Sequence, residues 1–108
     1  MTLEREISIK LQDLGIPAHL LGYRYGREAI KMTVDNFSMV NAITKGLYPA
    51  VAQKFNTSPS KVERAIRHAI ESANTRNATM RRTFNNIKPS NGEFIATIAD
   101  NIRLEKDF

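Results

Sequence analysis

The chain has 108 residues, enough for one hydrophobic core, and its 42% hydrophobic and 25% charged residues are typical of a soluble globular domain. It contains no cysteine, which excludes disulfides, thiolate metal sites and cysteine nucleophiles, and its apolar runs are too short to span a bilayer. The net charge of +5 indicates a basic protein, and the charged, amphipathic N-terminus is unlike a signal peptide, so we expect a cytoplasmic protein.

Apolar residues at helical spacing predict two helices in the first third of the chain and no strand. The first is expected at residues 3–14 and ends at Gly15, a residue that commonly terminates helices. The second is expected at residues 18–33. Gly22 and Gly26 each weaken it by about 1 kcal/mol relative to alanine.

The middle of the chain predicts two more helices, at residues 38–47 and 49–55. Pro49 suits the start of the latter, because the first turn of a helix needs no N–H from that residue. A polar turn follows and leads into a longer helix that we expect to end near residue 74.

The start of this longer helix can be read in two ways. Ser58 can cap it, with Pro59 in the first helical position. Alternatively, Ser60 and Glu63 can form a capping box, which would move the start by a residue or two.

The last third is polar and basic up to residue 89, with one helical turn expected around residues 80–84. Ser90 and Glu93 form a second capping-box pattern, which opens a final helix. We therefore predict an all-α fold. Residues 1–108 are expected to form a single domain, a compact bundle of about six helices.

A helix-turn-helix is expected at about residues 49–74, where a short helix and a basic amphipathic helix flank a brief turn. Three positions fit the packing of that motif. Ala52 is small, as a close helix crossing requires, and Asn56 tolerates a left-handed turn. Val62 is the apolar residue that would point back from the second helix to the first.

The second helix of this unit has a core face and a charged face. A helix about 10–12 Å across fits the DNA major groove, where arginine can donate two hydrogen bonds to guanine. The residues expected to read bases are Lys61, Glu63, Arg64, Arg67 and His68. His68 can equally be a partly exposed structural histidine.

The positive charge is concentrated around this unit. Residues 45–88 hold nine Lys/Arg against two Asp/Glu, whereas residues 1–44 are balanced and residues 89–108 are acidic. Such a block fits a polyanionic partner, although it also fits an ordinary solvated surface. The residues expected to bind DNA phosphates are Lys45, Lys54, Thr57, Ser58, Ser60, Arg81, Arg82 and Lys88.

Residues 47–71 read LYPAVAQKFNTSPSKVERAIRHAIE, and the run VERAIRHAIE within them is characteristic of one family. The chain resembles the C-terminal effector domain of the stage-zero sporulation regulator of endospore-forming bacteria. The resemblance also covers IPAHLLGYRYGREAI, ITKGLYP and KPSNGEFIATIADNIRLE, and so most of residues 15–105.

The resemblance implies a six-helix domain that reads a short box of TGTCGAA type in double-stranded DNA and regulates transcription. It also implies tandem self-association on DNA, contact with RNA polymerase, and a place in the bacterial cytoplasm associated with the nucleoid. The family's base-reading positions match Glu63 and Arg64 here, with Arg67 and His68 following. Family members carry a receiver domain in front, and none lies within these 108 residues.

The sequence departs from the family pattern at three places. Lys61 stands where arginine is usual, which loses bidentate geometry. Gly26 stands where leucine is usual. The stretch between Glu71 and Lys88 is about eight residues short and lacks a typical tryptophan, and in the family it helps neighbouring copies meet.

The sequence shows no pattern of a nucleophile with its base or of metal ligands, so we expect no catalytic residue, cofactor or metal and no enzymatic activity. We interpret the chain as a sequence-specific DNA-binding domain of a transcription regulator, with no membrane association. The alternative is a protein-interaction module whose basic helix docks on an acidic partner.

Overall fold

The computed structural model describes residues 1–106, and these residues form helices but no strand, which confirms the all-α prediction. The helices are α1 (Leu3–Asp13), α2 (Leu21–Asp35), η1 (Phe37–Asn41), η2 (Ile43–Leu47), α3 (Tyr48–Lys54), α4 (Pro59–Arg76), α5 (Ala78–Thr83) and α6 (Asn91–Lys106). The η segments are one short 3₁₀-helix and one short π-helix.

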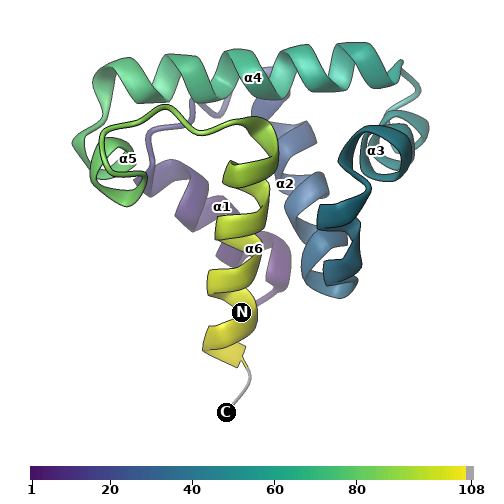
Figure 1. The fold of residues 1–108 in the computed structure, drawn as a ribbon, viewed down its shortest axis with the longest axis horizontal. Helices are drawn as coiled ribbons and strands as arrows, with labels where there is room; N and C mark the ends of the chain where they lie inside the picture. The colour runs from purple at the N-terminus through teal and green to yellow at the C-terminus, as the bar shows by residue number, and fades with distance from the viewer. Residues whose placement is uncertain (107–108) are drawn as a thin grey trace.

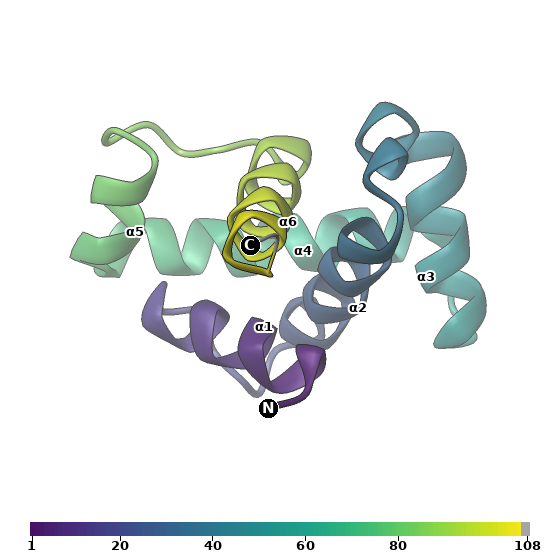
Figure 2. The ribbon, with the colours of Figure 1, turned by 90° about the horizontal axis from the view of Figure 1, so that it is seen from below.

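The long helix α4 lies along one edge of the molecule, and α1, α2 and α6 all lie on the same side of α4, below it in Figure 1. Seen from below, α3 and α5 lie near opposite ends of α4, with α6 between them (Figure 2). The core is made mainly of the apolar faces of α1, α2, α4 and α6, with further buried side chains from η2, α3 and α5. Its fully or almost fully buried side chains include Ile7, Leu11, Ile30, Ile66, Ile70, Phe94, Ile95 and Ile102.

The end of α1 and the start of α6 are set by the residues that the sequence indicated. Gly15 has a φ of +81°, the left-handed conformation that a glycine adopts without strain. At the start of α6 the Ser90 Oγ accepts from the Glu93 backbone N–H at 3.1 Å, and Glu93 Oε1 accepts from the Ser90 N–H at 3.0 Å. The predicted capping box is therefore confirmed.

The prediction of one continuous helix at residues 38–47 is wrong. The chain instead forms η1 and then η2, with a break at Ala42, whose φ of −141° and ψ of 44° are not helical. Pro49 contributes to the irregularity, because it has no N–H to donate to the carbonyl oxygen of Lys45 four residues earlier. The second predicted helix also starts later than expected, at Leu21.

A close crossing of α2 and α4 depends on Gly22. A Cβ atom placed on Gly22 would lie 2.1 Å from the backbone oxygen of Ala65 and 2.7 Å from the Cβ of Ala69. Only glycine allows the two helices to approach this closely. Gly22 thus lowers the helix propensity of α2 but allows α2 to pack closely against α4.

Candidate nucleic-acid interface

Helices α3 and α4 are joined by a tight turn with the packing expected of a helix-turn-helix. Ala52 is 2% exposed and Val62 is fully buried, so both lie in the contact between the helices. Asn56 has a φ of 54°, and the Thr57 backbone N–H donates to the Ala52 carbonyl oxygen at 2.9 Å. All three positions singled out in the sequence have the predicted conformation or burial.

The start of α4 follows the first of the two sequence readings. The Ser58 Oγ accepts from the Lys61 backbone N–H at 3.3 Å, and Pro59 is the first helical residue. The alternative capping box of Ser60 with Glu63 is not formed, because the Glu63 carboxylate pairs with Arg67 instead. This start places Lys61 in the first turn of α4, where its side chain is exposed.

One side of α4 packs against the bundle and the other faces outward, as Figure 1 shows for the helix as a whole. The buried side consists of Val62, Ile66, Ala69, Ile70 and Ala73. The exposed side consists of Ser60, Lys61, Arg64, Arg67, His68 and Glu71. The helix therefore presents a row of basic side chains on its outer face.

The five predicted base-reading residues divide into two groups. No side chain among residues 1–106 pairs with those of Lys61, Arg64 or His68. Glu63 and Arg67 pair with each other, with 3.1 Å from Arg67 Nε to Glu63 Oε2 and 3.5 Å from Nη2 to Oε1. A pair of this i, i+4 kind stabilises a helix by only about 0.3–0.5 kcal/mol, so it can open toward a ligand.

An open hollow of about 650 Å³ lies beside this face, between η2, α4 and residues 88–93. Glu63 and Arg67 line it from α4, and Lys88 lines it from the segment before α6. The outer face and the hollow are thus continuous at Glu63 and Arg67. Among residues 1–106 there is no cluster of side chains that could hold a metal ion.

The family model described as "Sporulation initiation factor Spo0A C terminal" matches residues 7–102. The chain belongs to this family. Its members are DNA-binding regulators of transcription in sporulation, which agrees with the basic outer face of α4. No helix in residues 1–106 has the length and hydropathy to cross a membrane.

The residues predicted to bind phosphate do not gather in one place in this family member. Lys54, Thr57, Ser58 and Ser60 lie around the α3–α4 turn. Arg81 and Arg82 lie on α5, near the other end of α4 (Figure 1). Lys45, in η2, and Lys88, before α6, are exposed and lie outside both groups.

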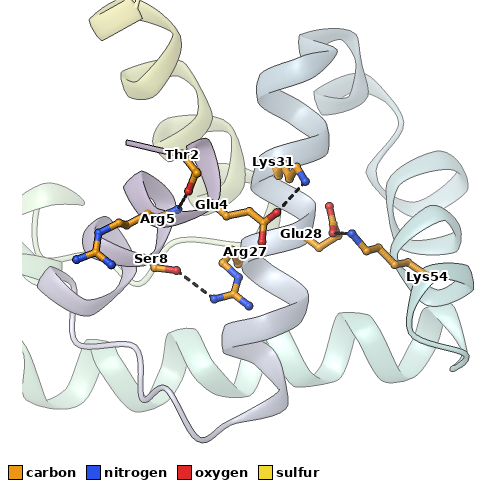
Figure 3. Close-up of polar contacts among 8 residues, drawn as sticks. All are labelled: Thr2, Glu4, Arg5, Ser8, Arg27, Glu28, Lys31 and Lys54. Carbon is orange, nitrogen blue, oxygen red and sulfur yellow. Dashed lines mark hydrogen bonds and ion pairs between the residues drawn. The ribbon is translucent and has the colours of Figure 1, made fainter.

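Several of these side chains already have partners within the molecule. Lys54 pairs with the largely buried Glu28 of α2 (Figure 3), and Lys88 Nζ lies 3.8 Å from Glu71 Oε2. Arg81 Nη1 donates to the Asn74 carbonyl oxygen at 3.5 Å, and Arg82 Nη2 donates to Thr79 Oγ1 at 3.3 Å. The cationic side chains of this set are therefore partly engaged, with Lys45 the exception among the described residues.

Sequence reasoning missed one residue that holds the interface in place. Asn91 is buried, and its Nδ2 donates to the Tyr48 hydroxyl and to the Glu63 carbonyl oxygen, both at 3.0 Å. Burial raises the pKa of Tyr48, and the Asn91 hydrogen bond offsets part of that effect. Asn91 thus joins α6 to α3 and α4. Its place beside the capping Ser90 was the only sequence signal.

Proposed function

We propose that this domain binds double-stranded DNA in a sequence-specific manner, with α3 and α4 as its helix-turn-helix and α4 in the major groove. The observation that carries this proposal is the exposed set of Lys61, Arg64 and His68 on the outer face of α4, whose side chains pair with none in residues 1–106. Their spacing of three and four residues brings the three side chains to one side of the helix. Membership of a DNA-binding family supports the same conclusion.

Within this proposal the two kinds of contact come from different residues. Lys61, Arg64 and His68 are the primary base readers, and Glu63 and Arg67 join them when their ion pair opens. The side chains and backbone N–H groups of Thr57, Ser58 and Ser60 bind phosphate at the start of α4, where the helix dipole favours an anion. Lys45 adds a phosphate contact, and Lys54, Arg81, Arg82 and Lys88 add more when their contacts with internal partners open.

The family resemblance makes a short box of TGTCGAA type our proposed target. Selection from random duplexes tests this without assuming a sequence, and it should enrich one short motif related to that box. Recovery of unrelated duplexes, with equal affinity for scrambled DNA, would favour the interaction module that docks on an acidic protein.

The salt dependence of binding gives an independent test of the phosphate contacts. Log affinity should fall linearly with log salt concentration, with a slope of about −0.9 for each phosphate contacted. Several contacts therefore give a steep decline. A nearly flat response would contradict DNA binding by this surface.

From the family resemblance alone we also propose that the domain self-associates on tandem boxes and contacts RNA polymerase. We further propose that it is not an enzyme. Duplexes with one and with two boxes test the first of these. Stronger binding per box on the tandem duplex is expected if copies meet, and equal binding per box would contradict self-association.

A further inference from the structure

A second hollow lies on a different face of the molecule, between α1, α2 and α3, and its lining carries a net positive charge. Its volume is about 170 Å³, and no residue of α4 lines it. The charged side chains that line it are Glu4, Arg24, Arg27, Glu28, Lys31 and Lys54. Most of them are drawn in Figure 3.

Both carboxylates of this hollow are already neutralised by lysines. Glu4 Oε1 lies 3.0 Å from Lys31 Nζ, and the Lys31 ammonium lowers the pKa of Glu4. Glu28 is only 8% exposed and pairs with Lys54 from α3. Two carboxylates and two ammonium groups cancel, so the charge of the remaining two guanidinium groups is not balanced locally.

The two guanidinium groups belong to Arg24 and Arg27, three residues apart and therefore on one side of α2. Arg27 is positioned by neutral groups: its Nη1 donates to Ser8 Oγ at 3.1 Å, and its Cζ lies 5.6 Å from the centre of the Tyr23 ring. Arg24 is exposed, and no carboxylate among residues 1–106 pairs with it. The planar fork of arginine matches the geometry of phosphate oxygens, with two parallel hydrogen bonds.

We propose that the hollow between α1, α2 and α3 binds a tetrahedral phosphate group through Arg24 and Arg27. Its volume is several times the roughly 30 Å³ that a water molecule occupies in the liquid, which leaves room for such a group with part of its hydration. The phosphate can come from free phosphate ion or from the backbone of a nucleic acid. The second source rests on the proposed function, whereas the first does not.

The test follows the arginine Nε–H signals by NMR while sodium phosphate is added, with sodium chloride at matched ionic strength as the reference. Saturable shifts are expected at Arg24 and Arg27 and not at Arg5. Arg5 is a suitable reference because its side chain extends away from the other charged groups of this cluster (Figure 3). A second titration uses the selected duplex in place of phosphate.

Arg24→Gln is the decisive variant, because Arg24 is exposed and its loss should leave the fold intact. Arg5→Gln is the matched control, since it removes one exposed guanidinium from the neighbouring helix. Thermal unfolding of both variants checks that the fold is retained. Arg27→Gln is less clean, because it also removes the contacts of Arg27 with Ser8 and Tyr23.

Three outcomes decide the proposal. Saturation by phosphate that is lost in Arg24→Gln and kept in Arg5→Gln supports the site with free phosphate as ligand. A response to duplex alone, with the salt slope of Arg24→Gln reduced by about 1, supports it with a backbone phosphate as ligand. No response beyond that to chloride in either titration overturns it. If the protein binds phosphate here but does not bind DNA, the result supports this site and contradicts the proposed function.

Discussion

The side-chain amide of Asn91, at the start of α6, donates a hydrogen bond of 3.0 Å to the backbone carbonyl oxygen of Glu63 in α4. The same Nδ2 atom donates to the Tyr48 hydroxyl at the start of α3. Glu63 lies one turn into α4, so the bond acts on the part of the helix that carries Lys61 and Arg64. One buried side chain therefore fixes how the proposed reading helix sits relative to α3 and α6.

Replacement of Asn91 by aspartate should destabilise the domain. Asn91→Asp keeps the size of the side chain but replaces the amide donor by an oxygen that faces the Glu63 carbonyl oxygen. Loss of this buried hydrogen bond leaves the Glu63 carbonyl oxygen unpaired, which costs about 1–3 kcal/mol. Thermal unfolding at neutral pH should show a lower Tm, whereas Asn101→Asp on the exposed side of α6 should leave Tm nearly unchanged. Equal Tm values for the two variants would show that Asn91 is not a structural link.

The sequence predicted most of the features that depend on local patterns. The turn at Asn56 and the charged face of α4 follow from residue type and spacing, because each involves neighbours in the chain. The cap at Ser58 was one of the two helix starts that the sequence allowed. Contacts between distant elements were not predicted. The ion pair of Lys54 with Glu28 and the hydrogen bonds of Asn91 join residues at least 26 positions apart, and no local pattern encodes them.

The two glycines of α2 should respond to alanine in opposite directions. A Cβ at Gly22 would meet the Ala65 backbone oxygen at 2.1 Å, so Gly22→Ala must force α2 and α4 apart and should destabilise by about 1–3 kcal/mol or more. A Cβ at Gly26 meets no atom within 4 Å, so Gly26→Ala should stabilise by up to about 1 kcal/mol through helix propensity. Urea unfolding of both variants measures the difference. A loss of stability at Gly26 equal to that at Gly22 would contradict this account of the crossing.

The capping box of α6 should make stability depend on acid pH. The Ser90 backbone N–H, and then its side chain, lower the pKa of Glu93 below the usual 4.5. The folded pKa is thus below the unfolded one, so the stabilisation is complete above about pH 4.5 and is lost as the pH falls through the lower folded value. Glu93→Gln should therefore lose stability at neutral pH and show a shallower acid decline than the original protein.

Asp100→Asn is the matched control for this prediction, because Asp100 is an exposed carboxylate on the same helix and makes no ion pair or side-chain hydrogen bond within residues 1–106. Thermal unfolding between pH 3 and pH 7 should give the same acid decline for Asp100→Asn as for the original protein. Glu4 retains its own pH dependence in all three proteins, since Lys31 also lowers its pKa. Parallel curves for Glu93→Gln and the original protein would contradict the role of the capping box.

Replacement of Lys54 should lower the stability of the folded domain, apart from any effect on DNA binding. Lys54→Ala leaves the largely buried Glu28 carboxylate without its cation, which should destabilise by about 1–3 kcal/mol, since the remaining charge is poorly solvated. The exposed Lys45 has no such partner among residues 1–106, so Lys45→Ala should leave Tm unchanged. Adding Glu28→Gln to Lys54→Ala should recover part of the loss. No recovery in the double variant would show that the ion pair is not the cause.

Arg64 should contribute base discrimination that another arginine of the same helix does not. It is exposed on the outer face of α4 and makes no side-chain ion pair within residues 1–106, so its guanidinium is free to donate two hydrogen bonds to a guanine. Arg64→Ala should weaken binding to the selected duplex by about 1–3 kcal/mol and relax the preference at one base pair.

Arg76→Ala is the control for this variant, because Arg76 is also exposed but ends the helix twelve residues later, about 18 Å along its axis. Affinities for the selected duplex and its single-base variants should be measured for both proteins at one salt concentration. Arg76→Ala should leave the pattern of discrimination unchanged. If Arg64→Ala loses as much affinity for scrambled DNA as for the selected duplex, Arg64 binds the phosphate backbone. The base readers must then lie elsewhere on α4.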